Sequence, residues 1–271
     1  MNMETKREQS SANEPTMNTP QGALASNPRG LFITGTDTGV GKTHVTCLIA
    51  RQLIAAGVET AAYKPVCSGG VQKQSAISPG VYDIEWEDIV RLSAATGGKW
   101  PDETICPQRF FAPLAPPVAA KMEGRTVDFQ LLVNGSRKFS GAEVLLVEGA
   151  GGWLSPLTES ATVADLAQEL RLPILIVARA GLGTINHTLL TIESVRARGL
   201  PIAGVVLNEV VSSGSDISYR TNGDEIQARG GVPVFGIVPH GTKFDLHQGG
   251  QSVTIYWQSL AGPMAEFKSP R

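Results

Sequence analysis

The sequence has little of what marks secreted, nucleic-acid-binding or membrane proteins. Among its 271 residues are 3 cysteines, Cys47, Cys67 and Cys106, and no two of them form a CxxC motif. We therefore expect neither a disulfide framework nor a zinc knuckle. The net charge is −2, from 23 Lys and Arg against 25 Asp and Glu. This balance gives no general electrostatic attraction for nucleic acid or for an anionic membrane surface.

Long apolar runs are also missing. No stretch approaches the roughly 18 uninterrupted apolar residues of a membrane-spanning helix. Residues 1–29 are polar and dotted with proline, and they contain neither the apolar run of a secretory leader nor the arginines of a transit peptide. We expect a cytoplasmic protein whose residues 1–29 form a disordered tail, with no membrane or nucleic-acid partner.

What the sequence does contain is a series of short apolar runs that alternate with segments of helical periodicity. Strands are expected at 30–35, 59–65, 144–147, 173–178, 202–207 and 234–238, and helices at 43–56, 85–96, 129–139, 161–170 and 188–198. Such alternation is typical of a parallel sheet covered on both faces. The sequence predicts one α/β domain over 30–241, with a single doubly wound, mostly parallel sheet. Residues 68–80 and 101–117 are expected to be irregular, and 242–271 form a C-terminal segment of uncertain structure.

A glycine-rich loop joins the first expected strand to the first expected helix. It reads Gly35-Thr-Asp-Thr-Gly-Val-Gly-Lys-Thr43, and a strand–loop–helix context is typical of the phosphate loop of P-loop NTPases. Backbone N–H groups and the positive end of the helix can hold a phosphate there. Lys42 can reach the phosphate oxygens, and the Thr43 hydroxyl can hold Mg²⁺. The loop predicts a nucleotide-binding site in preference to a simple helix-capping turn.

Other polar residues stand where strands end or helices begin. Glu148 follows an apolar strand, where a carboxylate can face the same crevice as the phosphate loop and hold a metal; the alternative is a solvated turn carboxylate. Lys64 ends the second strand, where it either binds an anion or is an ordinary surface lysine. Thr184 precedes a helix, where it either helps to bind a second anion or belongs to an ordinary helix-entry loop. Local sequence alone places Asp88 on an exposed acidic helix face.

Taken in order, these segments resemble the dethiobiotin synthetase family, the ATP-dependent ring-closing enzymes of biotin biosynthesis. The resemblance runs across residues 30–240, and its residues are Thr34-Gly-Thr-Asp-Thr-Gly-Val-Gly-Lys-Thr43, Tyr63-Lys-Pro-Val-Cys-Ser-Gly69, Val147-Glu-Gly-Ala-Gly-Gly-Trp153, Leu182-Gly-Thr-Ile-Asn-His187, Leu189-Leu-Thr191 and Ala203-Gly-Val-Val-Leu-Asn208. It implies a homodimer that converts 7,8-diaminopelargonic acid, CO₂ and ATP into dethiobiotin, ADP and phosphate. In this reaction an amine captures CO₂ as a carbamate, the γ-phosphate activates it, and the neighbouring amine closes the ring.

The resemblance also implies roles for individual residues, carried over position by position. The catalytic residues are Lys64, which stabilises the carbamate, together with Lys42 and Thr38. Mg²⁺ is held by Thr43, Asp88 and Glu148. ATP is bound by Gly39, Val40, Gly41, Lys42, Thr43, His44, Asp88, Glu148, Gly149, Ala150, Gly151, Asn208, Glu209, Pro239, His240 and Gly241. The substrate is bound by Ser68, Gly183, Thr184, Ile185 and Asn186, the last four on its carboxylate across the dimer interface.

A partitioning-type P-loop ATPase, acting as a nucleotide-dependent dimer switch, is the main alternative. Those proteins carry a second lysine early in the phosphate loop, where this chain has Asp37. A glutamine-using amidoligase would need an additional domain with a nucleophilic cysteine, for which the length leaves no room. A non-catalytic homologue is disfavoured because Lys42, Lys64 and Glu148 are all present.

Overall fold

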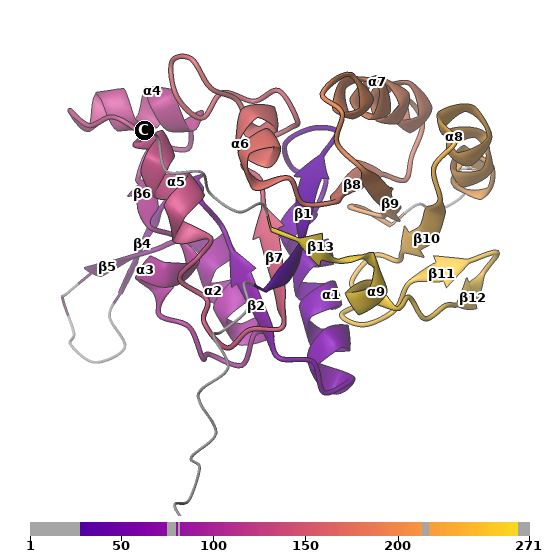
Figure 1. Cartoon of the computed structure of the whole chain (residues 1–271), viewed down its shortest axis with the longest axis horizontal. Helices are drawn as coiled ribbons and strands as arrows, with labels where there is room; N and C mark the ends of the chain where they lie inside the picture. Colours follow the sequence, from indigo (N-terminus) through magenta and orange to yellow (C-terminus); the bar gives the residue numbers. More distant parts are fainter. Residues whose placement is uncertain (1–27, 75–79, 81, 213–216, 265–271) are drawn as a thin grey trace, which may run out of the picture.

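The centre of the molecule is a twisted sheet of parallel strands (Figure 1). The computed structural model describes residues 28–74, 80, 82–212 and 217–264, so the expected tail lies almost wholly outside the described residues. In spatial order the parallel strands are β10 (Val234–Val238), β9 (Ile202–Asn208), β8 (Ile174–Arg179), β1 (Arg29–Gly35), β7 (Val144–Glu148) and β2 (Thr60–Tyr63). This arrangement confirms the predicted α/β fold.

Helices cover both faces of this sheet, which is why its strands are apolar along nearly their whole length. One core cluster lies under α1 (Lys42–Ala55), α2 (Glu87–Ala95) and the short α9 (Trp257–Leu260). The other lies under α5 (Phe129–Gly135), α6 (Val163–Leu170), α7 (Thr184–Ala197) and α8 (Asn222–Gly230). All five residues of β7 are buried. Within the described parts of the chain, no helix has both the length and the apolar character needed to cross a bilayer.

Two segments that we expected to be irregular contain regular structure. Between β2 and α2 lie β3 (Val66–Ser68), β4 (Val71–Gln74) and β5 (Tyr82–Glu85), and before α5 lie α3 (Asp102–Ile105), β6 (Gln108–Phe110) and α4 (Pro116–Met122). Strands β4 and β5 pair with each other as an antiparallel ribbon, and seven of their eight side chains are exposed. Tyr82-Asp-Ile-Glu85 does alternate apolar and polar residues, but over four residues only, and Val71-Gln-Lys-Gln74 has a single apolar residue, so the pattern was too short to be distinguished from a loop.

The C-terminal segment is an integral part of the sheet. β11 (His247–Gln248) and β12 (Gln251–Ser252) extend it in antiparallel fashion beyond β10. The chain then returns to the middle of the sheet, where β13 (Gly262–Pro263) pairs antiparallel with the start of β1. The short 3₁₀ helix η1 (Ile217–Arg220) precedes α8.

Trp257 anchors this segment to the helix that follows the phosphate loop. Its side chain is 2% exposed and packs edge-to-face on Phe235, with ring centroids 5.6 Å apart. The indole Nε1–H donates to Gln52 Oε1 of α1 at 2.5 Å, and Gln52 Nε2 donates to the Phe244 carbonyl at 2.6 Å. The C-terminal segment therefore stabilises the position of α1.

Replacing Trp257 with Ala should lower the free energy of unfolding by about 3–5 kcal/mol, because it empties a fully packed site and removes the indole N–H that Gln52 Oε1 accepts. The neighbouring Tyr256 is 80% exposed, so Tyr256→Ala should change stability by no more than about 0.5 kcal/mol. Urea unfolding followed by circular dichroism measures both variants. Equal losses would show that the segment does not depend on the indole.

Candidate active site

At its end the phosphate loop takes a left-handed backbone conformation, which glycine adopts without strain. Gly41 caps α1 with φ 91°, and no side chain caps the first N–H groups of the helix. These donors are therefore available for an anion at the positive end of α1. Across the loop, Lys42 Nζ donates to the Asp37 carbonyl at 3.2 Å. This is the lysine that the sequence predicts to bind phosphate.

A buried ion pair lies at the carboxyl ends of two neighbouring strands. Strands β2 and β7 are parallel, with Tyr63 opposite Val147, so the residues that follow, Lys64 and Glu148, meet at one edge of the sheet. Lys64 Nζ is 2.6 Å from Glu148 Oε1. Their side chains are 5% and 0% exposed. Each charge is buried only because the other is present.

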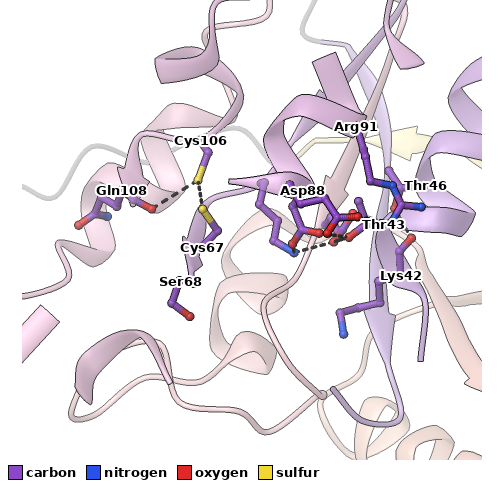
Figure 2. Close-up of polar contacts among 12 residues, drawn as sticks. Lys42, Thr43, Thr46, Cys67, Ser68, Asp88, Arg91, Cys106 and Gln108 are labelled. Atoms are coloured by element: carbon purple, nitrogen blue, oxygen red, sulfur yellow. Dashed lines mark hydrogen bonds and ion pairs between the residues drawn. The ribbon is translucent and has the colours of Figure 1, made fainter. Parts of the chain in front are cut away.

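Helices α1 and α2 add two oxygen-bearing side chains, the Thr43 hydroxyl and the Asp88 carboxylate, to this pair (Figure 2). Asp88 Oδ2 is 2.9 Å from Lys64 Nζ. The Thr43 hydroxyl lies 2.8 Å from Asp88 Oδ1 and 2.7 Å from Glu148 Oε1. A hydroxyl has a single proton, so Thr43 donates to one carboxylate at a time. The structure thus brings together the predicted metal-binding residues and the predicted catalytic lysine.

The charges of this cluster perturb one another. Burial alone would lower the pKa of Lys64, but the carboxylates of Glu148 and Asp88 outweigh it and raise that pKa above its ordinary value. For Asp88, burial is likewise opposed by the charge and hydrogen bond of Lys64, and its pKa is lowered. Burial and the positive charge of Lys64 lower the pKa of Lys42 to about 8. An additional anion beside Lys42 would therefore be stabilised.

The oxygen atoms of this cluster fit a divalent cation. Glu148 Oε2 is buried and has no hydrogen-bond partner among the described residues, and its carboxylate shares the Thr43 hydroxyl with Asp88. Two carboxylates and a hydroxyl are ligands that suit Mg²⁺, which usually takes its other ligands from water and phosphate. The described residues contain no group of three or more His, Cys, Asp or Glu side chains that could hold a metal by themselves.

Two hollows meet above this cluster. The first, of about 250 Å³, is lined by Thr38, Gly39, Gly41, Lys42, Thr43, His44, Lys64, Asp88, Arg91, Glu148 and Gly151. The second, of about 520 Å³, is mostly apolar and is lined by Thr38, Ser68, Pro113, Leu114, Ala115, Pro116, Ala150, Gly151, Ser155 and Pro156. Because Thr38 and Gly151 line both, a ligand in one hollow can contact a ligand in the other.

Some predicted residues line neither hollow. Val40 is buried in the core and offers its carbonyl to Asn208 Nδ2 at 3.0 Å, so Asn208 supports the phosphate loop from behind. Gly149 packs against β1, its N–H donating to the Ile33 carbonyl. Residues 183–186 form the start of α7, outside both hollows.

A loop after β10 contains another group of predicted ATP-binding residues. The carboxylate of Glu209, which follows β9, accepts the backbone N–H of His240 at 2.9 Å. The N–H of Thr242 donates to the Pro239 carbonyl at 3.3 Å, so a turn forms around Gly241. These contacts join Glu209 to the Pro239–Gly241 loop, although none of these residues lines either hollow.

Sequence reasoning missed two cations near the phosphate loop. Arg179, at the end of β8, donates to the Thr38 carbonyl at 3.2 Å and lies 3.7 Å from Asp37 Oδ2. Arg91 lines the first hollow from α2. Its spacing from Asp88, three residues along one helix, was a signal that both side chains lie on the same helix face.

Replacing Gly41 with Ala should be far more harmful than replacing Gly39. Both glycines have positive φ, 91° and 70°, so either alanine costs about 1 kcal/mol of backbone strain. A Cβ at Gly41 would also overlap the Asn208 amide, whereas nothing lies within 4 Å of a Cβ at Gly39. We expect an additional loss of about 1–3 kcal/mol for Gly41→Ala in urea unfolding. Equal losses in the two variants would contradict this packing argument.

Comparison with known proteins places the chain in a family. Residues 29–247 match the AAA domain family. An ATP-dependent dethiobiotin synthetase of Anaeromyxobacter sp. (strain Fw109-5) is 52% identical over 199 residues, which cover 73% of this chain and 84% of that protein. The ATP-dependent dethiobiotin synthetase of Bacillus subtilis (strain 168) is 40% identical over 212 residues, 78% of this chain and 87% of that protein.

Similarity to solved structures is much lower. A ParA family ATPase from Chlorobium tepidum aligns over 79% of this chain and 84% of that one, with 13% identity and a TM-score of 0.44, too low to carry an argument. The relatives at 40% and 52% identity, by contrast, match along most of their own length. The chain therefore belongs to the AAA domain family and, among its relatives, to the ATP-dependent dethiobiotin synthetases.

Proposed function

We propose that this protein uses ATP and Mg²⁺ to join CO₂ to 7,8-diaminopelargonic acid and close the ureido ring of dethiobiotin, releasing ADP and phosphate. The observation that carries the proposal is the position of Lys64. It is buried at the phosphate loop, bound to two carboxylates, and lies beside a hollow large enough for an organic substrate. The names of the 40–52% identical relatives support the reaction.

The first hollow fits the triphosphate. The backbone N–H groups at the start of α1 would bind phosphate oxygens, and Lys42 would exchange its contact with the Asp37 carbonyl for them. Mg²⁺, when bound by Thr43, Asp88 and Glu148, would neutralise phosphate charge. We propose that the Pro239–Gly241 loop and Asn208 contribute to the nucleoside end of this site.

The second hollow fits an aliphatic diamine. Its walls are largely proline, leucine and alanine, and Ser68, whose hydroxyl donates to the Leu114 carbonyl at 2.6 Å, provides a polar group at one side. The reacting amines would lie at the junction of the two hollows, next to Thr38. Holding both reactants in line at this junction would supply much of the rate enhancement.

Lys64 would stabilise the carbamate and the developing phosphoryl charge. Its raised pKa keeps the ammonium charged, and its contacts with Glu148 and Asp88 fix its position before substrate binds. A fixed charge aimed at the reacting oxygens need not reorganise during the reaction. The chemical steps themselves follow from the substrate: the carbamate takes the γ-phosphoryl group, and the second amine then displaces phosphate.

We further propose that the protein is a homodimer. Residues 183–186 would then bind the carboxylate of a substrate molecule that lies in the active site of the partner subunit. Supporting this, Leu182 is 88% exposed just before α7, and Leu154 and Leu190, both 56% exposed, line a hollow of about 380 Å³ next to the phosphate loop. Exposed apolar groups of this kind gather where proteins associate.

The phosphate loop disfavours a partitioning-type switch. The position of that family's second lysine is held by Asp37, which lies 3.7 Å from Arg179. A carboxylate paired in this way cannot contact a phosphate across a dimer as an ammonium would.

The reaction is tested by assays that leave out one substrate at a time. Purified protein with Mg-ATP, bicarbonate and diaminopelargonic acid should release ADP only when both carbon substrates are present, with dethiobiotin detected by mass spectrometry. ADP release that is indifferent to the diamine would overturn the proposal and favour a switch ATPase. Removing Mg²⁺ with EDTA should stop turnover.

Two lysine variants should separate binding from chemistry. Lys64→Gln should lower kcat by at least about 100-fold, because it removes charge needed in the transition state, while ADP affinity stays within about threefold. Lys42→Gln should weaken ADP binding by about tenfold or more, because that lysine meets the phosphates. Steady-state kinetics and calorimetry measure the two effects.

Circular dichroism serves as the folding control, since removing Lys64 leaves two carboxylates close together. Normal turnover by a folded Lys64→Gln protein would end the assignment of that lysine.

A further inference from the structure

We infer that Arg91 is a nucleotide-binding residue that holds the phosphates of ATP that are not transferred. The inference rests on the nucleotide site of the proposed function and assigns to it a residue on α2. Arg91 lines the same 250 Å³ hollow as Lys42, Thr43 and His44. Its side chain is 39% exposed, so it is partly held and still open to a ligand.

Helix α2 presents two functional groups on one face. Asp88 and Arg91 are three residues apart, and both point toward the start of α1 (Figure 2). Asp88 contacts Thr43. Arg91 Nη2 lies 3.4 Å from Nδ1 of His44, the next residue along α1. The helix therefore faces the nucleotide with its metal-binding carboxylate and a cation one turn further on.

The cations of the hollow are engaged to different degrees. Lys64 contacts both carboxylates, Glu148 and Asp88, at 2.6 and 2.9 Å. Among the described residues, the hydrogen bond that Lys42 Nζ donates goes to a backbone carbonyl, that of Asp37. The acidic group that Arg91 reaches is Glu87, at 3.5 Å and itself 78% exposed, and such a surface pair is weak. Lys42 and Arg91 are thus the cations of this hollow whose charge is least neutralised by carboxylates, so they can bind a polyanion.

The contacts separate Arg91 from the lysine of the reaction. Lys64 contacts Glu148 and Asp88, and the Thr43 hydroxyl contacts the same two carboxylates. Arg91 instead contacts His44, the residue after Thr43. If the transferred phosphoryl group lies at Lys64, the guanidinium faces the part of the nucleotide that remains as ADP. Its planar array of N–H donors suits two phosphate oxygens at once.

A group that binds ATP and ADP alike lowers the KM without raising kcat. Arg91→Gln should therefore weaken ADP binding by about tenfold, leave adenosine binding unchanged, and raise the KM for ATP while kcat stays within about twofold. The binding arm is measured by calorimetry in EDTA at fixed ionic strength, so that it depends on neither metal nor turnover. Arg91→Lys, which keeps the charge, should recover part of the affinity.

Glu87→Gln is the matched control, because it breaks the same ion pair at the same side-chain length. If Arg91 binds phosphate, Glu87→Gln should keep ADP affinity at or above that of the original protein. Equal losses in Arg91→Gln and Glu87→Gln would show that the ion pair only supports α2, and would overturn the inference.

The remaining outcomes separate this inference from the proposed function. An unchanged ADP affinity in Arg91→Gln, or an equal loss of adenosine binding, overturns the assignment of Arg91 alone. A fall in kcat with unchanged KM would place Arg91 at the transferred phosphoryl group and also overturn it. If the unsubstituted protein itself fails to bind ADP, both the nucleotide site and Arg91's part in it fall together.

Discussion

The buried contact between Lys64 and Glu148 is the interaction on which the rest of the site depends. Neither charge could be buried alone without a large desolvation cost, and they meet because β2 and β7 are adjacent parallel strands that end at the same edge. Asp88 and Thr43 join the same pair. Four side chains thus connect two strands to α1 and α2, and the phosphate loop is fixed relative to the lysine before any ligand arrives.

The central fold could be read from the sequence because its strands are buried on both faces. Runs such as Val144-Leu-Leu-Val147 have no polar alternation, and the structure places each of them inside the parallel sheet. The phosphate loop was recognisable from its glycines and lysine together with its place between an expected strand and an expected helix. Bringing Asp88 to Thr43, by contrast, required the family resemblance, since the local sequence around Asp88 indicated only an acidic helix face.

What the sequence did not show depends on contacts between distant segments. The β4–β5 ribbon is exposed on both faces, and each of its strands is four residues long, too short for the alternation in Tyr82-Asp-Ile-Glu85 to stand out. Arg91 and Arg179 reach the phosphate loop region only through the fold. Arg91 is 47 residues along the chain from its contact His44, and Arg179 is 141 residues from its contact Thr38. The strands of residues 247–263 are two residues long, too short for any hydrophobic pattern.

The pairing of β13 with β1 brings the two ends of the described chain side by side. Arg29 lies opposite Pro263, so a short linker between them would turn the chain into a nearly closed ring without disturbing the sheet. Such a molecule lends itself to circular permutation, with new termini opened in the exposed β4–β5 ribbon. It also means that the strand leading into the phosphate loop gains this backbone partner only after residue 263 has been made.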